Sequence, residues 1–366
     1  MTTAVPRGGA DVDGAWLLAT LEELLAVPSP TGATDAVARL VAERCAELGI
    51  ATRRDRRGTL IGRLPAAGSD GEAPARRAVA AHLDTIGMMV AEVRADGRLR
   101  VVPVGTHSPR FSEGARVIVL RDGDVDAAAG PLTGTVLPLR ASGHAFGDAV
   151  DELAHRWDLV EVRLDADVQD EAGVAAIGVR VGDLVAHVAR AERTASGHVV
   201  SRHLDDKGGV AALLAACRAL RDRGVTPTVD VDLLFTVTEE VGHGASHCVA
   251  PSVEELVAVE CAVVAPGQAS TETGVTIVMQ DLNGPTDRPL NALLEGLAVS
   301  EGLEVHRDVF THFRTDAAAA LVAGADVRTA IVGFGVDATH GHERTHTDGL
   351  MATARLLAAY LVAPVG

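Results

Sequence analysis

The hydrophobic pattern of this chain changes near residue 93 and changes back near residue 190. Outside this stretch, runs long enough for helices alternate with short apolar runs, which is typical of an α/β sheet covered by helices. Inside it, short alternating runs such as GRLRVVPVG and GARVIVLRDG are separated by glycine at roughly ten-residue spacing. This pattern predicts a small β-barrel or sandwich inserted into an α/β domain.

A chain of 366 residues exceeds one ordinary hydrophobic core, so we expect two domains. Residues 1–92 and 190–366 are predicted to form the α/β domain, and residues 93–189 the inserted β-rich domain. Apolar residues make up 47% of the chain but aromatic residues only 2%. The core must therefore be filled by small and branched side chains, which suits close packing of helices on a sheet.

Several elements of the α/β domain have clear start and stop signals. Helices are expected over 13–26, ended by Pro28 and Pro30, and over 34–48, ended by Gly49. The run AVAAHLDTIGMMV is predicted to be a buried strand that ends at His82. The other predicted elements are helices over 205–224, 288–302 and 348–362 and strands over 228–238, 255–264 and 327–336.

The charge balance excludes several classes of partner. The formal net charge is −17, whereas nucleic acid and anionic membranes need a basic surface. No apolar run approaches the roughly 18 residues of a membrane helix, and the N-terminal segment has no signal-peptide core. The four cysteines are scattered, which disfavours both a disulfide framework and a cysteine zinc site. We expect a soluble cytoplasmic protein that binds neither nucleic acid nor membrane.

Acidic residues and histidines collect where predicted strands end or helices begin, in AHLDTIG, RHLDDKGG, TEEVGHG, AVECAVVAPG and ERTHTDG. Ligands bind at the carboxyl ends of strands in open α/β sheets, so we expect these segments to meet. Imidazole and carboxylate groups are good zinc ligands. Five residues from five segments could hold two divalent metal ions: His82, Asp205, Glu240, Glu260 and His346.

Each of these residues also has a purely structural explanation. Asp205 could only cap a helix, and a lone histidine near a strand is more often structural than a ligand. Glu260 is harder to explain in this way, because it interrupts the apolar run LVAVECAVV and a buried charge needs a partner. The ordered set HxD, DDKGG, EExG, E and H is more specific than any single residue, and it favours a metal site.

The adjacent glutamates Glu239 and Glu240 raise the question of why two like charges stand together at the end of a strand. A division of roles would explain the pair. Glu240 would bind metal, and Glu239 would act as general base toward a water molecule that the metals activate. Arg314 and Asp316 in FRTDAAAA could line a substrate pocket, although Arg314 could equally form an ordinary surface ion pair.

These motifs resemble those of a known family. VPSPTG, HLDTIGMMV, LDDKGG and TEEVG are similar to the core motifs of the tetrahedral (TET-type) aminopeptidases, co-catalytic zinc metallopeptidases that include glutamyl and deblocking aminopeptidases. The segment IGVRVGDLV resembles the end of that family's inserted domain, so the resemblance spans nearly the whole chain. It implies an α/β metallopeptidase domain with a mixed sheet and helices on both faces, interrupted by a small barrel-like domain used for dimerisation and assembly.

The resemblance also implies roles for individual residues. Asp205 would bridge two metal ions, and Glu239 would be the general base. Asp84 would orient His82 through its second ring nitrogen. The implied metal is Zn²⁺, with Co²⁺ or Mn²⁺ as alternatives. The family's usual fourth ligand is an aspartate where this chain has Glu260, whose longer reach affects geometry and metal preference. Members form dodecameric tetrahedral shells from dimers, so a homo-oligomer, specifically a dodecamer, is expected.

Three functions remain open from the sequence. The segments VAPGQASTETGVTIVMQDLNGPTD and FGVDATHGHERTH resemble the subgroup that accompanies the N-acetylglutaminylglutamine amide osmoprotectant system. The first prediction is a dinuclear metal-dependent aminopeptidase that cleaves short peptides or a capped dipeptide. An alternative is a metal-dependent deacylase or amidase, because a capped dipeptide has no free α-amine. A non-catalytic assembly or binding relative is the third, which the presence of Glu239 disfavours since binding alone needs no base.

Overall fold

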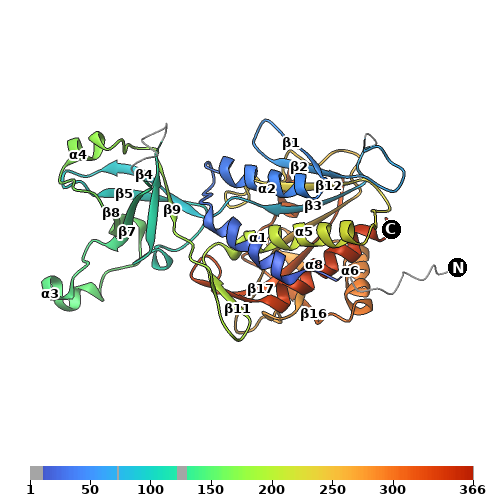
Figure 1. Cartoon of the computed structure of the whole chain (residues 1–366). Coiled ribbons are helices and arrows are strands. Elements are labelled where there is room, and N and C mark those ends of the chain that lie inside the picture. The colour runs from blue at the N-terminus through green and yellow to red at the C-terminus, as the bar shows by residue number, and fades with distance from the viewer. Residues whose placement is uncertain (1–10, 72–73, 122–129, 366) are drawn as a thin grey trace. The chain divides into compact units, whose positions relative to one another are not determined.

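The structure is a computed structural model that describes residues 11–71, 74–121 and 130–365 (Figure 1). Contacts within the chain divide it into two units. The sheet unit comprises the chain up to Val27, Thr34–Asp84 and the chain from Arg190 onward, and the barrel unit comprises Pro28–Ala33 and Thr85–Ala189. The barrel unit thus begins at Thr85, ahead of the predicted boundary at residue 93, because the strand that follows His82 pairs within the barrel.

Twelve strands of the described residues form one mixed sheet. The main path runs through β1 (Ala51–Arg54), β2 (Leu60–Leu64), β12 (Val231–Thr236), β3 (Arg77–His82), β13 (Glu255–Val264), β17 (Arg328–Asp337), β18 (Glu343–His346), β11 (His198–Ser201) and β10 (Glu192–Arg193). Off this path, β14 (Val275–Asp281) pairs with β17, β15 (Gly284–Pro285) and β16 (Val305–Val309). The four central strands, β12, β3, β13 and β17, are parallel, so their carboxyl ends lie at one edge.

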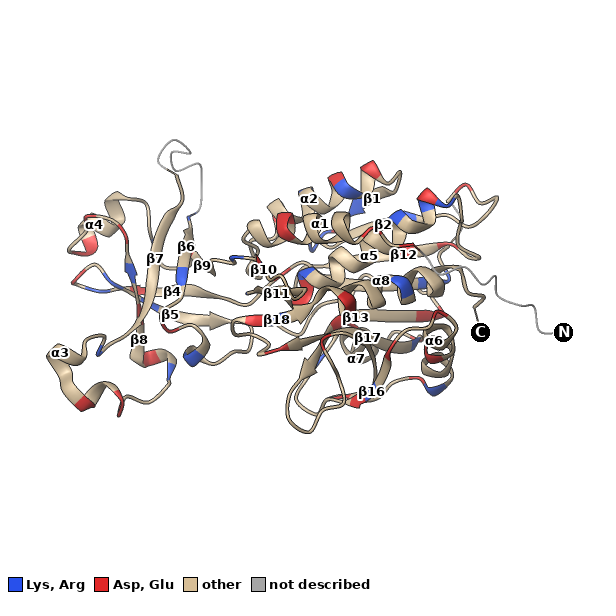
Figure 2. Ribbon diagram, turned by 60° about the horizontal axis from the view of Figure 1, so that its bottom comes forward, with Lys and Arg blue, Asp and Glu red and all other residues tan. Residues whose placement is uncertain are grey.

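Helices cover both faces of this sheet, as predicted. On one face, α5 (Leu204–Asp222) packs against β3 and β13 and contacts both α1 (Gly14–Ala26) and α8 (Thr347–Val362). On the other face, α7 (Asp316–Val322) contacts β3, β13 and β17 (Figure 2). The helix α2 (Asp35–Glu47) packs beside β1 and β2, and α6 (Arg288–Ser300) packs beside β14 and α8. No helix of the described ranges is long and apolar enough to cross a membrane.

The barrel unit is a closed six-stranded antiparallel barrel, which confirms the predicted β-rich insertion. Its strands, in spatial order, are β4 (Gly87–Val93), β5 (Leu99–Val104), β8 (Val160–Leu164), β7 (Leu132–Pro138), β6 (Arg116–Leu120) and β9 (Leu184–His187). Two short helices, α3 (Gly143–Phe146) and α4 (Glu171–Ala176), and 3-10 turns at Pro109–Phe111, Gly147–Val150 and Trp157–Leu159 connect the strands. Valine and leucine side chains fill the barrel core, as the low aromatic content requires.

A buried ion pair joins the start of β3 to the end of the chain. Arg77 is fully buried, and its Nη2 donates to Glu255 Oε2 at 2.8 Å. Its Nη1 donates to the carbonyl oxygens of Tyr360 at 2.6 Å and Ala363 at 2.9 Å. Glu255 also accepts hydrogen bonds from Arg328 and from the Tyr360 hydroxyl. One buried network therefore ties β3, β13 and β17 to the end of α8.

Removal of Arg77 should strongly destabilise the sheet unit. We expect Arg77→Ala to lower the free energy of unfolding by about 3–5 kcal/mol, because Glu255 would remain as a buried charge with fewer partners. The matched control is Arg76→Ala, since Arg76 makes a bidentate but exposed ion pair with Glu254. Exposed pairs contribute little, so the control should barely move the transition. Urea unfolding followed by far-ultraviolet circular dichroism measures both, and equal midpoints would contradict the prediction.

Candidate metal centre

Except for His346, the predicted metal ligands and the predicted base lie where the central parallel strands end. His82 is the last residue of β3, and Glu239 and Glu240 lie in the turn after β12. In β13, Ala258 pairs with Ala80 of β3, so the parallel register places Glu260 level with His82. Asp205 lies at the start of α5, which packs on these same two strands. Four segments of the chain therefore contribute to one edge of the sheet unit.

The side chains form two adjoining groups, each of which could hold a metal ion. One group is His82, Glu239 and Glu260, and the other is Asp205, Glu240 and His340, with the candidate ligand atoms of each group within 4.8 Å of one another. Asp205 connects the groups, because its Oδ1 lies 3.1 Å from His82 Nε2 and its Oδ2 lies 3.5 Å from His340 Nε2. Glu260 Oε2 lies 3.8 Å from His82 Nε2, and Glu240 Oε2 lies 3.5 Å from His340 Nε2.

His346, which we predicted as a ligand, lies outside both groups, and His340 takes its place. His346 ends β18, where its Nε2 donates to the carbonyl oxygen of Ser196 at 2.9 Å. Its Nδ1 accepts the N–H of Asp348 at 3.1 Å and so caps the start of α8. Both ring nitrogens of His346 are engaged in structural hydrogen bonds, whereas His340 lies in the loop that leaves β17 at the edge where the site is formed.

Asp84 supports the site through two of its groups. Its backbone carbonyl accepts a hydrogen bond from His82 Nδ1 at 2.8 Å, which leaves His82 Nε2 for the site. Its buried carboxylate accepts the N–H of Glu239 at 3.1 Å and that of Glu240 at 3.3 Å. The hydrogen bond at His82 Nδ1, which we predicted for the carboxylate, is therefore made by the main chain. The carboxylate instead holds the turn that carries the two glutamates.

The motif DDKGG is explained by close packing at the start of α5. A Cβ atom at Gly208 would lie 2.4 Å from the ring of Phe334, and one at Gly209 would lie 2.2 Å from Asp206 Oδ1. Asp206 accepts the Gly209 N–H at 3.2 Å through Oδ1 and the His82 N–H at 3.3 Å through Oδ2. The two glycines thus allow α5 to approach the sheet closely enough for Asp206 to fasten the end of β3.

Asp316, one of the two residues predicted to line a substrate pocket, is a buried support. Its Oδ2 accepts the Thr236 hydroxyl at 2.7 Å, and its Oδ1 accepts the Ala245 N–H at 2.7 Å. It therefore fastens the end of β12 to the loop that follows the two glutamates. Arg314 is exposed, and it opposes the rise in the pKa of Asp281 that burial causes. A substrate role for Arg314 stays a prediction.

The site crowds carboxylates together in a buried position. Burial raises the pKa values of Glu239 and Glu260 well above their usual range, and that of Glu240 to about 7. Burial opposes a charge on His340, but the neighbouring carboxylates raise its pKa to about 10. Burial also opposes ionisation of Asp205, yet the two adjacent imidazoles hold its pKa below the usual range. The site as a whole therefore attracts positive charge.

The donor set fits divalent cations. Glu260 Oε1 is buried and has no hydrogen-bond partner among the residues that the structure describes, and a buried carboxylate oxygen without a partner is costly. Imidazole nitrogens and carboxylate oxygens are ligands that zinc takes, and cobalt and manganese accept the same donors. Cations held here would neutralise the crowded carboxylates and give Glu260 Oε1 a partner. The residues present thus fit the metal that the sequence predicts.

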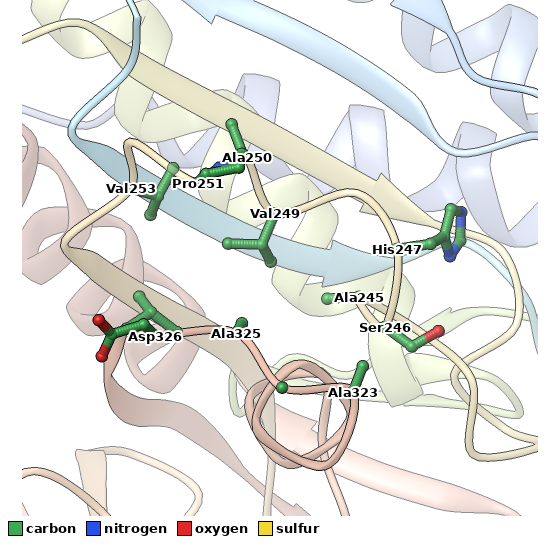
Figure 3. Close-up of a pocket in the computed structure, with 12 residues that line it drawn as sticks. Ala245, Ser246, His247, Val249, Ala250, Pro251, Val253, Ala323, Ala325 and Asp326 are labelled. Atoms are coloured by element: carbon green, nitrogen blue, oxygen red, sulfur yellow. The ribbon is translucent and has the colours of Figure 1, made fainter.

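A separate hollow of about 370 Å³ lies between the loop at 245–253 and the turn that follows α7 (Figure 3). Its lining is mostly alanine, valine, proline and glycine, with His247 and Asp326 as the residues able to carry charge. His247 Nε2 lies 3.0 Å from a carboxylate oxygen of Asp55. The predicted metal and catalytic residues are not part of this lining, so the hollow is distinct from the metal centre.

Comparison with known proteins identifies the family of this chain. Residues 58–356 match the M42 glutamyl aminopeptidase family. The chain is also 34% identical over 346 residues to YhfE of Bacillus subtilis (strain 168), which is named as a candidate aminopeptidase. That similarity covers 94% of this chain and 97% of YhfE. This chain belongs to the M42 glutamyl aminopeptidase family, whose members are metal-dependent aminopeptidases.

Solved structures share the fold over both units. The aminopeptidase APDkam598 from the archaeon Desulfurococcus kamchatkensis matches with a TM-score of 0.82 at 23% identity, over 95% of each chain. The TET1 peptidase of Pyrococcus horikoshii, which can assemble into a tetrahedron or a large octahedral shell, matches with a TM-score of 0.82 at 22% identity. That match covers 94% of this chain and 99% of the other. At these identities the similarity establishes the fold.

The assignment of His340 to the site in place of His346 can be tested with two alanine variants. We expect His340→Ala to lower kcat/KM by more than about 100-fold, since even residues that only support a metal ligand typically cost 10–100-fold. We expect His346→Ala to keep most of the activity and to lose about 1 kcal/mol of stability, because it removes the cap of α8. Peptidase assays and thermal unfolding measure both effects. Loss of activity in His346→Ala alone would restore the original prediction.

Proposed function

We propose that this protein is a dinuclear metal-dependent aminopeptidase. The observation that carries the proposal is the position of Asp205, whose two carboxylate oxygens lie near the imidazoles of His82 and His340, one in each group. A carboxylate between two sets of ligands is suited to bridging a pair of metal ions. His82 and Glu260 would hold one ion and Glu240 and His340 the other, with Asp205 shared.

The reaction needs a base beside the ions. When bound, two divalent cations polarise the scissile carbonyl and lower the pKa of the attacking water. Glu239 Oε2 lies 4.0 Å from His82 Nε2, while its neighbour Glu240 belongs to the other group. Glu239 would take the proton from water and deliver it to the leaving amine as the C–N bond breaks. Asp84 would keep Glu239 in place through its hydrogen bond to the Glu239 N–H.

The substrate class has two candidates. Short peptides with a free α-amine are the first, since relatives are aminopeptidases. Capped dipeptides are the second, supported by the similarity of VAPGQASTETGVTIVMQDLNGPTD to the osmoprotectant subgroup, and they would make the enzyme an amidase with the same ligands and base. A paired panel of aminoacyl substrates and N-acetylated, C-amidated dipeptides separates the two. Cleavage of the blocked dipeptides alone would assign the amidase activity.

The proposal extends to assembly, because the matched TET1 peptidase of Pyrococcus horikoshii forms closed shells. We propose a homo-oligomer in which dimers build a dodecamer. Among the described residues of the barrel unit, five large apolar side chains are exposed, and exposed apolar groups favour burial against another chain. They are Met89, Val102, Phe111, Phe146 and Val181. Sedimentation of the full chain tests the assembly, and a monomeric mass would count against it.

The role of Glu239 is tested by Glu239→Gln, which keeps the size of the side chain but removes the base. We expect kcat to fall by at least about 100-fold, with the metal content of the purified protein unchanged. Zinc measured by mass spectrometry on wild type and variant reports the second quantity, and removal of the metal with a chelator should abolish activity in the wild type. Retained turnover would contradict the assignment of the base. Loss of metal from Glu239→Gln would instead make Glu239 a ligand.

A further inference from the structure

Glu343 is a buried carboxylate that the proposed reaction does not use. It is the first residue of β18 and is 1% exposed. Its Oε1 accepts the N–H of His340 at 2.9 Å, and its Oε2 accepts the N–H of Asp205 at 3.2 Å. Glu343 therefore links the main chains of two proposed ligands that are far apart in the sequence.

The topology of the sheet makes this link possible. Glu343 of β18 pairs with Ser201 of β11 in antiparallel register. The chain that leaves β11 passes directly into α5 and reaches Asp205, while His340 lies just before Glu343 in the preceding loop. A second contact crosses at the same place, because Arg202 Nη1 donates to the Gly341 carbonyl oxygen at 3.4 Å. One side chain between the two segments can thus set the separation of Asp205 from His340.

The backbone on both sides of Glu343 needs such support. His340 has φ = +64°, and His203, which precedes α5, has φ = +65°. This left-handed region is unfavourable for a residue other than glycine, so surrounding contacts must hold each residue there. The hydrogen bond from the His340 N–H to Glu343 is one such contact, and it acts on a residue that carries a proposed ligand.

We propose that Glu343 is a positioning residue that holds Asp205 and His340 at the separation required by the ion in the second group. It acts through the N–H groups of both ligands, since its own oxygens are occupied by them. The inference rests on the proposed dinuclear function and deepens it, because it assigns the affinity for one ion to a residue outside the ligand set. The ion at His82 and Glu260 should depend less on Glu343, because β3 and β13 place those two ligands.

The experiment compares Glu343→Ala and Glu343→Gln with wild type and with Asp308→Asn as a matched control. Asp308 in β16 is also a buried carboxylate, and it accepts the N–H groups of Ala269 and Ser270. It lies two strands beyond β17 in the sheet, so its variant reports the general cost of replacing a buried carboxylate that accepts main-chain N–H groups. Glutamine keeps one acceptor oxygen and the size of glutamate, so Glu343→Gln should retain part of the function.

The full-length apoproteins are titrated with Zn²⁺ against a chromophoric chelator, which reports the number and affinity of the bound ions. We expect two ions in wild type and in Asp308→Asn. We expect Glu343→Ala to bind one ion with unchanged affinity and the other about 10–100-fold more weakly, as is typical when support of a metal ligand is lost. Glu343→Gln should lie between these results, and it decides the matter if Glu343→Ala does not fold.

Three outcomes would overturn the inference, and they are distinguishable. Two ions bound by the wild type, with both affinities unchanged in the Glu343 variants, would remove the positioning role and leave the dinuclear function standing. A wild type that binds fewer than two ions would remove the dinuclear function itself, and the role of Glu343 with it. A fall in both affinities equal to that in Asp308→Asn would show a general effect on stability and would also contradict the proposed role.

Discussion

The site depends on the position of one carboxylate, that of Asp205, between two imidazoles. His82 and His340 approach its two oxygens from different segments, and three glutamates lie close to the same point. Buried carboxylates this close together repel one another and lose their hydration. The arrangement is therefore stable only with positive charge among them. The parallel sheet provides the convergence, because β12, β3 and β13 end at one edge and α5 begins above it.

Around this point, buried carboxylates support the main chain. Asp84 accepts the N–H groups of both adjacent glutamates, Asp206 accepts that of His82, and Asp316 accepts that of Ala245. Each bond satisfies a backbone donor that would otherwise be buried without a partner, and it ties a site segment to an element elsewhere in the sheet unit. These three buried carboxylates therefore fix the geometry of the segments that carry the site residues.

Most of the fold could be predicted from the sequence, because its signals are local. The helix ends at Gly49 and before Pro28 and the buried run that ends at His82 all lie where the pattern indicates. The barrel boundary was missed because β3 and β4 form one hydrophobic run, and which strand pairs with which is a long-range property.

His340 was missed for the same kind of reason. HGHERTH offers three histidines with similar surroundings, and only the loop conformation and the pairing of β11 with β18 distinguish them. Ligand and supporting carboxylates also look alike in sequence, which is why Asp316 was predicted at the substrate.

The central claim is that Asp205 is shared by two metal ions. Anomalous X-ray diffraction from crystals of the zinc-loaded protein, collected on both sides of the zinc absorption edge, tests it most directly. If Asp205 is shared, the map will show two anomalous peaks per chain on opposite sides of its carboxylate, one beside His82 and Glu260 and the other beside Glu240 and His340. A single peak, or a peak at His346, would contradict it.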